Sequence, residues 1–362
     1  MSEPSPSLGS VLVVGGGGFL GQRIVKQLIE SGDSSHITVF DLKVDGNRII
    51  GPDYVAGNIT SKEDVMAVLN QAKPKVIFHT ASPKPLGNNK KLFEEVNING
   101  TRNLVECAKE AGFTKAFIYT SSSSIIHDNY SDIVNATEDA PLCFVPEQKQ
   151  YYSHTKAVAE TIVMEANTPG GLLTCAIRPA GLFGEGDWQL YGNMAKNAKE
   201  GKAKMQIGKG NNLFDYTYIS NHVDAQLLAA NKLVLPNPPE GDMKVDGEAF
   251  VITNDDPWPF WDFARAVGAG AGYPVKKEQV WSIPLGVMNV FAGIAEVGTD
   301  IVTRGKGEAT LTRSKIKYSV MTRTFNIEKA KKRLGYVPKV SMQEGLDRTA
   351  KWYVEAVKKD KK

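Results

Sequence analysis

A glycine-rich turn near the start of the chain constrains the fold more than any other feature. It reads Gly15-Gly16-Gly17-Gly18-Phe19-Leu20-Gly21 and follows an apolar, β-branched run over residues 11–14. Because glycine has no side chain, the spacing of Gly15, Gly18 and Gly21 allows a tight turn, a close approach of the backbone to a phosphate, and close packing of helix on strand. We therefore predict a strand, a phosphate-binding turn and a helix, with Gly15, Gly18, Phe19, Leu20 and Gly21 against a bound pyrophosphate.

Short apolar runs then alternate with longer amphipathic stretches through the first half of the chain. The runs predict strands over 11–14, 37–40, 75–79, 116–120 and 173–177, and the stretches predict helices over 20–30, 62–71, 92–111 and 152–166. This alternation is typical of an α/β fold, a Rossmann-type doubly wound parallel sheet. We expect a nucleotide-binding domain over 8–185, to which 214–254 return. Residues 186–213 and 255–350 are expected to form a smaller C-terminal substrate-binding domain.

An acidic residue ends the second predicted strand. Asp41 lies 20 residues after Gly21, where a carboxylate accepts hydrogen bonds from the adenosine ribose of a dinucleotide. A 2′-phosphate would be repelled there, so Asp41 favours NAD. The nearby cation Lys43 leaves NADP possible.

A phenol and an ammonium lie four residues apart in Tyr152-Ser153-His154-Thr155-Lys156. On a helix they share one face, so the cation can lower the pKa of the phenol and still reach a cofactor ribose. Tyr273 and Lys277 repeat the spacing, but Pro274 makes a helix there doubtful. Tyr152 also follows, by about 30 residues, a hydroxyl cluster over 120–124 at a strand end. A hydroxyl at that edge of the sheet can position a substrate oxygen against the phenol.

Composition and charge argue against a metal-binding protein and against a nucleic-acid-binding protein. The proportions are those of an ordinary globular chain, and the three cysteines and five histidines show no metal-ligand spacing, so no metal site is expected. Residues 304–333 hold ten Lys or Arg against two Glu, a net charge of +8 that leaves −5 for the rest of a chain whose net charge is +3. This basic segment lacks interleaved aromatic residues and any recognised nucleic-acid module, so we expect no nucleic-acid partner.

An apolar stretch precedes the basic segment. Residues 279–295 carry no charge. A helix over 285–302 would place Val287, Val290, Phe291, Ile294, Val297 and Ile301 on one face. The stretch is too interrupted for a comfortable membrane span. Two interpretations stay open: the helix packs on the core, or it lies in a membrane surface beside the basic segment.

Several motifs together resemble the extended short-chain dehydrogenases, and within them the 3β-hydroxysteroid dehydrogenase group. They are the glycine turn, the strand region 76–83 with His79-Thr80-Ala81-Ser82-Pro83, Asn97-Ile98-Asn99-Gly100-Thr101, 119–124, Tyr152 with Lys156, Arg178-Pro179-Ala180-Gly181-Leu182-Phe183-Gly184, and Asp215-Tyr216-Thr217-Tyr218-Ile219. The similarity extends from about residue 11 to about residue 346. It is strongest to members of the group that act on sterols carrying a 4α-carboxylate.

The resemblance implies roles for individual residues. Tyr152 would be the general base, Lys156 its pKa partner and ribose ligand, and Ser122 the hydroxyl that polarises the substrate. Further cofactor contacts are implied at Thr80, Ala81, Ser82, Pro179, Asn58 and Ile59. Two departures stand out: Gly57-Asn58-Ile59 replaces the usual Gly-Asp-Ile/Leu, and Thr155 replaces the usual Ser before the lysine.

The implied activity is NAD-dependent oxidation of the 3β-hydroxyl of a 4α-carboxysterol with decarboxylation, a step of sterol biosynthesis. The implied setting is the cytosolic face of the endoplasmic reticulum membrane, with peripheral attachment, other sterol C4-demethylation enzymes as partners and a homodimer as one possible state. Two enzymatic alternatives stay open: another 3β-hydroxysteroid dehydrogenase, and a nucleotide-sugar epimerase or dehydratase. From another class, a non-catalytic, NAD-sensing, membrane-associated binding protein stays open as well.

Overall fold

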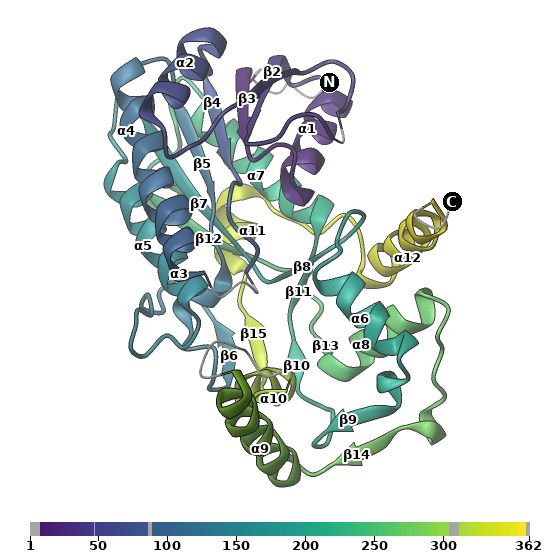
Figure 1. The fold of residues 1–362 in the computed structure, drawn as a ribbon. Helices are drawn as coiled ribbons and strands as arrows, with labels where there is room; N and C mark the ends of the chain where they lie inside the picture. Colours follow the sequence, from purple (N-terminus) through teal and green to yellow (C-terminus); the bar gives the residue numbers. More distant parts are fainter. Residues whose placement is uncertain (1–7, 47, 86–88, 304–310, 360–362) are drawn as a thin grey trace.

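A sheet of seven parallel strands forms the centre of the molecule (Figure 1). The computed structural model describes residues 8–46, 48–85, 89–303 and 311–359. The strand order is β12-β7-β5-β4-β1-β2-β3. The strands are β1 (Gly9–Val14), β2 (Ser34–Asp41), β3 (Asp53–Ala56), β4 (Val76–His79), β5 (Ala116–Thr120), β7 (Leu173–Pro179) and β12 (Glu248–Ile252). The predicted doubly wound parallel sheet is confirmed.

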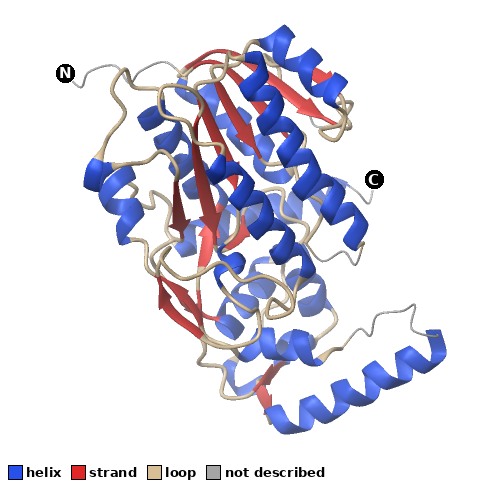
Figure 2. Ribbon diagram, turned by 90° about the vertical axis from the view of Figure 1, so that its left-hand side faces the viewer, coloured by secondary structure: helices blue, strands red, loops and turns tan. Residues whose placement is uncertain are grey.

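Alternating side chains along each strand bury both faces of this sheet. On β1, Leu12 and Val14 pack on one side, whereas Val11 and Val13 pack on the other. Helices cover both faces (Figures 1 and 2). One layer holds α2 (Lys62–Ala72), α4 (Thr101–Ala111) and α5 (Tyr151–Glu165), and the other holds α1 (Phe19–Ser31), α7 (Ile219–Leu233) and α11 (Glu328–Leu334).

The helix predicted over 92–111 is interrupted. The structure has α3 (Lys90–Phe93), a π-helical segment over Glu94–Gly100, and then α4. A π-helix adds a residue to each turn, which re-aims side chains without disturbing the apolar pattern of the flanking turns. For this reason the amphipathic pattern indicates one continuous helix. In the structure Asn97 is buried in the π-helical segment, and the pattern does not reveal this.

A smaller lobe lies beside the large sheet (Figure 1). One of its sheets has the order β13-β10-β15-β6, and the pairs β8 with β11 and β9 with β14 complete its strands. Its strands are β6 (Ile133–Ala136), β8 (Gly181–Phe183), β9 (Met205–Ile207), β10 (Leu213–Phe214), β11 (Tyr216–Tyr218), β13 (Trp258–Pro259), β14 (Trp281–Ile283) and β15 (Arg323–Phe325). Its helices are α6 (Leu190–Lys199), α8 (Phe260–Gly270), α9 (Leu285–Thr303), α10 (Arg313–Val320) and α12 (Met342–Lys359).

The later part of the chain also contributes to the large sheet. β12 pairs with β7, and α7 packs on β5 and β7. The domain boundaries expected from the sequence stay a prediction, with β12 and α7 inside the segment expected to return.

Aromatic rings hold the smaller lobe together. The Phe263 ring is fully buried and stacks on the Tyr216 ring, with centroids 3.7 Å apart and planes 13° from parallel. Phe183 meets the same Phe263 ring edge-on at 5.3 Å. Large rings packed this closely contribute both buried apolar area and specific ring contacts.

We expect Phe263→Ala to lower the free energy of unfolding by about 3–5 kcal/mol, because it leaves a cavity between Tyr216 and Phe183. Urea denaturation measures the effect. Phe113→Ala is the matched control, since Phe113 is 40% exposed, and its effect should be much smaller. Equal destabilisation by the two substitutions would contradict the assignment of Phe263 to the core.

Candidate active site

The glycine turn leaves no room for side chains. A Cβ on Gly15 would lie 2.6 Å from the backbone nitrogen of Ala81, and one on Gly21 would lie 2.3 Å from the carbonyl oxygen of Gly15. Gly15 also has a φ of +81°, in the left-handed region that favours glycine. The turn between β1 and α1 therefore brings bare backbone to the carboxyl edge of the sheet.

The N-terminus of α1 opens onto this turn without a side-chain cap. Gly18 is the N-cap residue, and no side chain accepts a hydrogen bond from the first turn there. Uncapped N–H groups at a helix N-terminus suit a phosphate. Asp41, at the end of β2, accepts a hydrogen bond from the Gly17 nitrogen at 3.0 Å. The turn and its neighbouring carboxylate thus fit the pyrophosphate and ribose of a dinucleotide.

The other predicted cofactor residues lie in three places. Thr80 follows β4 and its nitrogen donates to the Val14 carbonyl at 2.9 Å, with Ala81 and Ser82 next in the chain. Pro179 is the last residue of β7, at the same sheet edge. Asn58 and Ile59 follow β3, where the Asn58 side-chain oxygen accepts from the Thr60 nitrogen at 3.0 Å. The Asn58 amide nitrogen is then the group left to meet an adenine edge.

Tyr152 and Lys156 lie one turn apart in α5, as the spacing predicts. The Lys156 ammonium donates to the Thr120 carbonyl at 2.5 Å and lies 4.2 Å from the centre of the Tyr119 ring. The Tyr152 phenol hydrogen-bonds the Ser82 hydroxyl, and its ring meets Phe93 edge-on. Tyr273, by contrast, lies in a loop before the short 3₁₀ turn Lys277–Gln279.

Burial shifts the pKa values of both groups in the direction of the uncharged forms. It raises the pKa of the Tyr152 phenol to about 12 and lowers the pKa of the Lys156 ammonium to about 7. The spacing of Tyr152 and Lys156 predicts instead that the cation lowers the pKa of the phenol. In the chain alone the desolvation of Tyr152 dominates, and Lys156 turns to Thr120.

Ser122 is joined to the tyrosine helix through other hydroxyls. The Ser122 and Ser124 hydroxyl oxygens lie 2.8 Å apart, and the Ser153 hydroxyl donates to that of Ser124, also at 2.8 Å. Ser122 is partly exposed, whereas Ser121, Ser123 and Ser124 are buried. Within the described residues, no hydrogen bond joins Ser122 directly to Tyr152. The hydroxyl chain nevertheless fixes Ser122 to the residue that follows Tyr152 in α5.

Buried amides complete this network, and the sequence did not indicate them. Asn129 donates to the Ser153 hydroxyl at 3.1 Å and to the Gln148 side-chain oxygen at 2.7 Å. On the other side of α5, Asn97 accepts from the Ser82 hydroxyl at 2.9 Å and donates to Thr155 at 3.0 Å. Asn97 belongs to a motif that supports the family resemblance, and the π-helical segment gives its side chain this direction.

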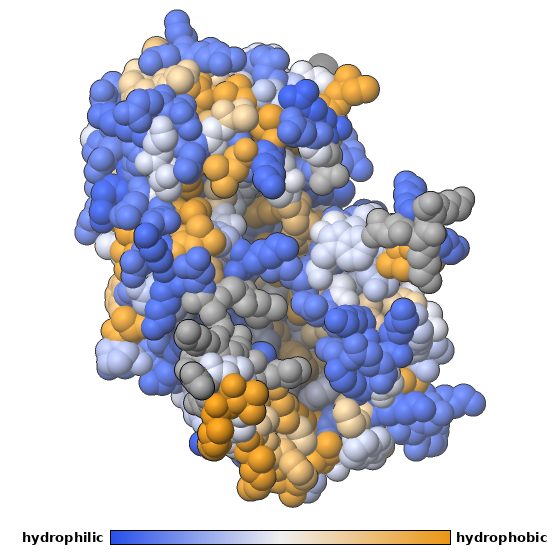
Figure 3. Space-filling view, in the orientation of Figure 1, coloured by the Kyte–Doolittle hydropathy of each residue, from blue (hydrophilic) through white to orange (hydrophobic). Residues whose placement is uncertain are grey.

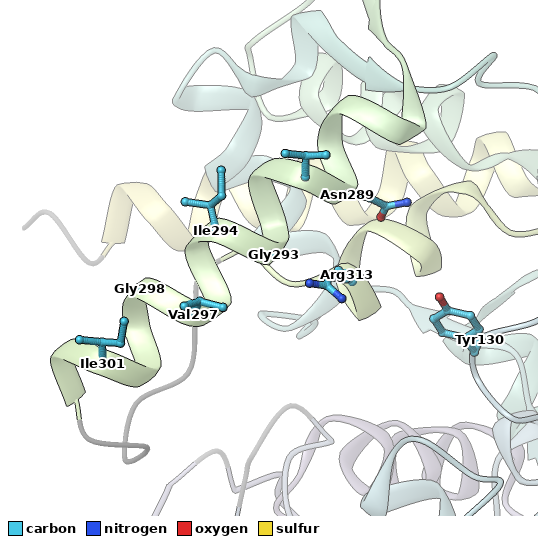
Figure 4. Close-up of a pocket in the computed structure, with 9 residues that line it drawn as sticks. Tyr130, Asn289, Gly293, Ile294, Val297, Gly298, Ile301 and Arg313 are labelled. Atoms are coloured by element: carbon cyan, nitrogen blue, oxygen red, sulfur yellow. The ribbon is translucent and has the colours of Figure 1, made fainter.

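An open groove of about 750 Å³ follows the flank of α9, away from the residues predicted to be catalytic. Figure 4 shows Asn289 and Arg313 at this groove, with Tyr130 across from them and Ile294, Val297 and Ile301 along α9. Tyr130 lies six residues after the hydroxyl of Ser124. The groove therefore connects the exposed side of α9 with the loop beyond the hydroxyl cluster.

The apolar face of α9 is exposed. Val290, Phe291, Ile294 and Val297 are each more than half exposed, and they form an apolar patch at the bottom of Figure 3. By length and composition alone, α9 could also cross a membrane, and only 12% of its most apolar window is buried. The sequence pattern instead predicts a stretch that is too interrupted for a membrane span. The core-packing interpretation holds only for the opposite side, where Ala292 is buried.

Most described cations of the basic segment are paired with carboxylates. The pairs are Arg313 with Glu296, Lys317 with Asp132, Lys329 with Glu248, Lys331 with Asp255, Lys332 with Asp242, and Arg333 with Glu248. Residues 304–310, with Arg304 and Lys306, lie outside the described residues. The net charge of this segment is therefore largely balanced by acidic residues of the same molecule.

Among the described residues, no group of three or more metal-ligating side chains gathers.

Solved structures share this fold. The epimerase Mth375 of Methanothermobacter thermautotrophicus superposes with a TM-score of 0.72 and 19% identity, over 99% of this chain and 95% of that one. A Thermus thermophilus UDP-glucose 4-epimerase in complex with NAD gives a TM-score of 0.69 and 20% identity, over 95% and 98%. At such identities the likeness shows the fold alone, which is a Rossmann-type doubly wound sheet with a smaller lobe.

The sequence comparisons define the family more closely. The model of the 3-beta hydroxysteroid dehydrogenase/isomerase family matches residues 12–285. The chain is 38% identical to the Saccharomyces cerevisiae sterol-4-alpha-carboxylate 3-dehydrogenase, decarboxylating, over 96% of this chain and 99% of that protein. It is 37% identical to the human enzyme of that name, over 93% and 86%. The chain belongs to the 3-beta hydroxysteroid dehydrogenase/isomerase family.

The lowered pKa of Lys156 makes the stability of the protein depend on pH. Below about pH 7 the ammonium is charged in both states and the folded state bears the full cost of burying it. As the pH rises, the folded state releases its proton first, so that cost falls. We expect the free energy of unfolding of the wild type to rise relative to Lys156→Met between about pH 7 and pH 9. Urea denaturation across this range tests it, and a constant difference would contradict the buried, proton-releasing ammonium.

Proposed function

We propose that this chain is an NAD-dependent sterol-4α-carboxylate 3-dehydrogenase that oxidises a 3β-hydroxyl and releases the 4α-carboxylate as carbon dioxide. The observation that carries the proposal is the hydroxyl chain from Ser122 through Ser124 to Ser153, which joins Ser122 to the helix that carries Tyr152 and Lys156. Relatives matched over 99% and 86% of their own length are named sterol-4-alpha-carboxylate 3-dehydrogenase, decarboxylating.

The residues of the chain would divide the work as follows. The Ser122 hydroxyl donates a hydrogen bond to the substrate's 3-oxygen, and the Tyr152 oxygen takes the hydroxyl proton. Lys156 binds the cofactor ribose and, when charged, supports the ionised phenol. NAD, when bound, would supply the oxidising power as the acceptor of the hydride from C3. For Lys156 to act, it must exchange its contact with Thr120 for the ribose.

Decarboxylation then needs little from the protein. Oxidation at C3 makes the substrate a β-keto acid. The bond between C4 and the carboxylate breaks, carbon dioxide leaves, and the electron pair moves onto the C3 oxygen as an enolate, which is protonated at C4. The Ser122 hydroxyl donates to the same oxygen in this step and stabilises the enolate.

The sequence comparisons support a sterol over a sugar nucleotide. The Saccharomyces cerevisiae and human relatives, at 38% and 37% identity, are named for a sterol carboxylate. The UDP-glucose 4-epimerase of Thermus thermophilus shares the fold at only 20% identity. A nucleotide-sugar enzyme also needs cations and polar groups to hold a diphosphate, whereas the apolar body of a sterol needs apolar contacts.

Tyr152→Phe removes the proton acceptor and keeps the ring. We expect turnover to fall by about 10²–10⁴-fold or more with NAD affinity unchanged. The assay is NADH formation with carbon dioxide release from a 4α-carboxysterol, with UDP-glucose as the sugar-nucleotide control. Tyr151→Phe is the matched control, because the adjacent phenol contacts Glu94 instead, and it should stay active. Full turnover by Tyr152→Phe would overturn the assignment of the base.

We also propose that α9 attaches the protein to the surface of the endoplasmic reticulum membrane. The exposed Val290, Phe291, Ile294 and Val297 supply the inserted face. Glu296 accepts from the Arg313 nitrogen at 2.8 Å and pairs with its guanidinium, which fastens α9 along the protein. This tether favours an in-plane helix over a span. Because the neighbouring cations are paired, apolar insertion outweighs attraction to anionic lipid.

Binding to lipid vesicles tests whether apolar insertion of α9 attaches the protein to a membrane. Phe291→Ser combined with Ile294→Ser should weaken binding to phosphatidylcholine vesicles by on the order of 100-fold, from the lost burial of two large side chains. Salt at about 1 M should leave the wild type bound, because it screens charges only. Flotation measures both. Val134→Ser, at a 68% exposed site on β6, is the control. Undiminished binding of the double variant, or release by salt alone, would sink the proposal.

A further inference from the structure

Arg323 is a buried arginine in the middle of the smaller lobe. It starts β15, where it pairs with Phe214 of β10 and Ile133 of β6, and only 5% of it is exposed. Its guanidinium carbon lies 5.5 Å from the centre of the Phe214 ring and 5.6 Å from that of Phe325. A permanently charged group is thus enclosed by aromatic side chains.

The guanidinium is incompletely paired. One terminal nitrogen donates to the Ser123 hydroxyl at 3.2 Å and the other to the Tyr318 hydroxyl at 3.4 Å. The Nε atom is buried and has no hydrogen-bond partner among the described residues. No described carboxylate lies within 4.0 Å of the guanidinium, whereas Lys317 and Lys329 of the same segment both have one.

Asp215, an acidic residue that interacts electrostatically with Arg323, is engaged elsewhere. Asp215 accepts a hydrogen bond from the Phe325 nitrogen at 2.8 Å. Burial raises the pKa of the Asp215 carboxyl to about 7, so its negative charge is incomplete near neutrality. Burying a guanidinium without a full counter-charge is costly, and ring faces offset only part of the cost. The arrangement suits an anion supplied from outside the chain.

The position of Arg323 identifies that anion. Its hydrogen-bond partner Ser123 is the residue after Ser122, which the proposed function places on the substrate's 3-oxygen. A 4α-carboxylate lies on the carbon next to C3, so it must lie close to Ser122 as well. Two neutral hydrogen bonds to Ser123 and Tyr318 could be made by an uncharged amide. Only an anionic partner compensates the full positive charge of the Arg323 guanidinium.

We propose that Arg323 is the group that binds the 4α-carboxylate of the substrate and so selects carboxylated sterols over neutral ones. The inference rests on the proposed function. A planar guanidinium matches a carboxylate in both charge and shape. The free Nε–H, beside the terminal nitrogens, provides the donor that the chain itself leaves unused.

The test compares Arg323→Met with the wild type on two sterols that differ only at C4, one with a 4α-carboxylate and one with a 4α-methyl group. We expect kcat/KM for NADH formation to fall by about 100- to 1000-fold with the carboxylate, mainly through KM, and to change little with the methyl sterol. Arg323→Lys should keep part of the preference because it keeps the charge. Arg265→Met is the matched control, since Arg265 is already paired with Asp262 at 2.6 Å.

A binding measurement separates this proposal from the proposed function. Quenching of tryptophan fluorescence gives the affinity of each sterol without turnover, and circular dichroism with urea denaturation checks that the variants fold. If the wild type oxidises neither sterol but binds the carboxylated one more tightly, and Arg323→Met abolishes that difference, the proposed function fails and the role of Arg323 stands. An unchanged preference in Arg323→Met, or an equal loss with both sterols in a folded variant, would overturn it.

Discussion

The contact between α1 and the glycine turn is the constraint on which the rest of the site depends. With Gly21 touching the Gly15 carbonyl, no residue larger than glycine fits, and α1 is held with its N-terminus at the carboxyl edge of the sheet. The same packing brings Ala81 against Gly15, so the segment after β4 is placed at the turn as well. Ser82 in that segment then reaches Tyr152. Backbone packing between the first strand and helix thereby sets where the phenol of a distant helix can lie.

Local patterns predicted the large sheet well because its strands bury both faces. The apolar runs match β1, β2, β4, β5 and β7 within about three residues at each end. The error in the helix over 92–111 has a physical cause, since a π-helical insertion leaves the apolar periodicity of its flanks intact. The predicted site residues Ser122, Tyr152 and Lys156 were found from local context and the resemblance, and their catalytic roles stay predictions.

Residues that act across the chain were beyond local patterns. Ser123 and Arg323 are separated by 200 positions, and in the sequence Arg323 counted only as one of ten cations. Asn129 and Gln148 have no motif, yet they support the hydroxyl chain that ends at Ser122. The charge count was equally incomplete. It showed a strongly basic segment, and the fold pairs much of that charge with carboxylates far away in sequence, such as Glu248.

The Glu296–Arg313 pair joins α9 to α10, and α10 leads through a short turn into β15, which begins with Arg323. The segment exposed on the outside of the molecule is therefore continuous with the strand that carries the buried guanidinium. If α9 lies in a lipid surface, the orientation of the whole protein relative to that surface is fixed by this connection. A sterol leaving the bilayer beside α9 would then travel along the protein surface. It would avoid transfer through open water, and that transfer is the largest barrier to moving so insoluble a molecule.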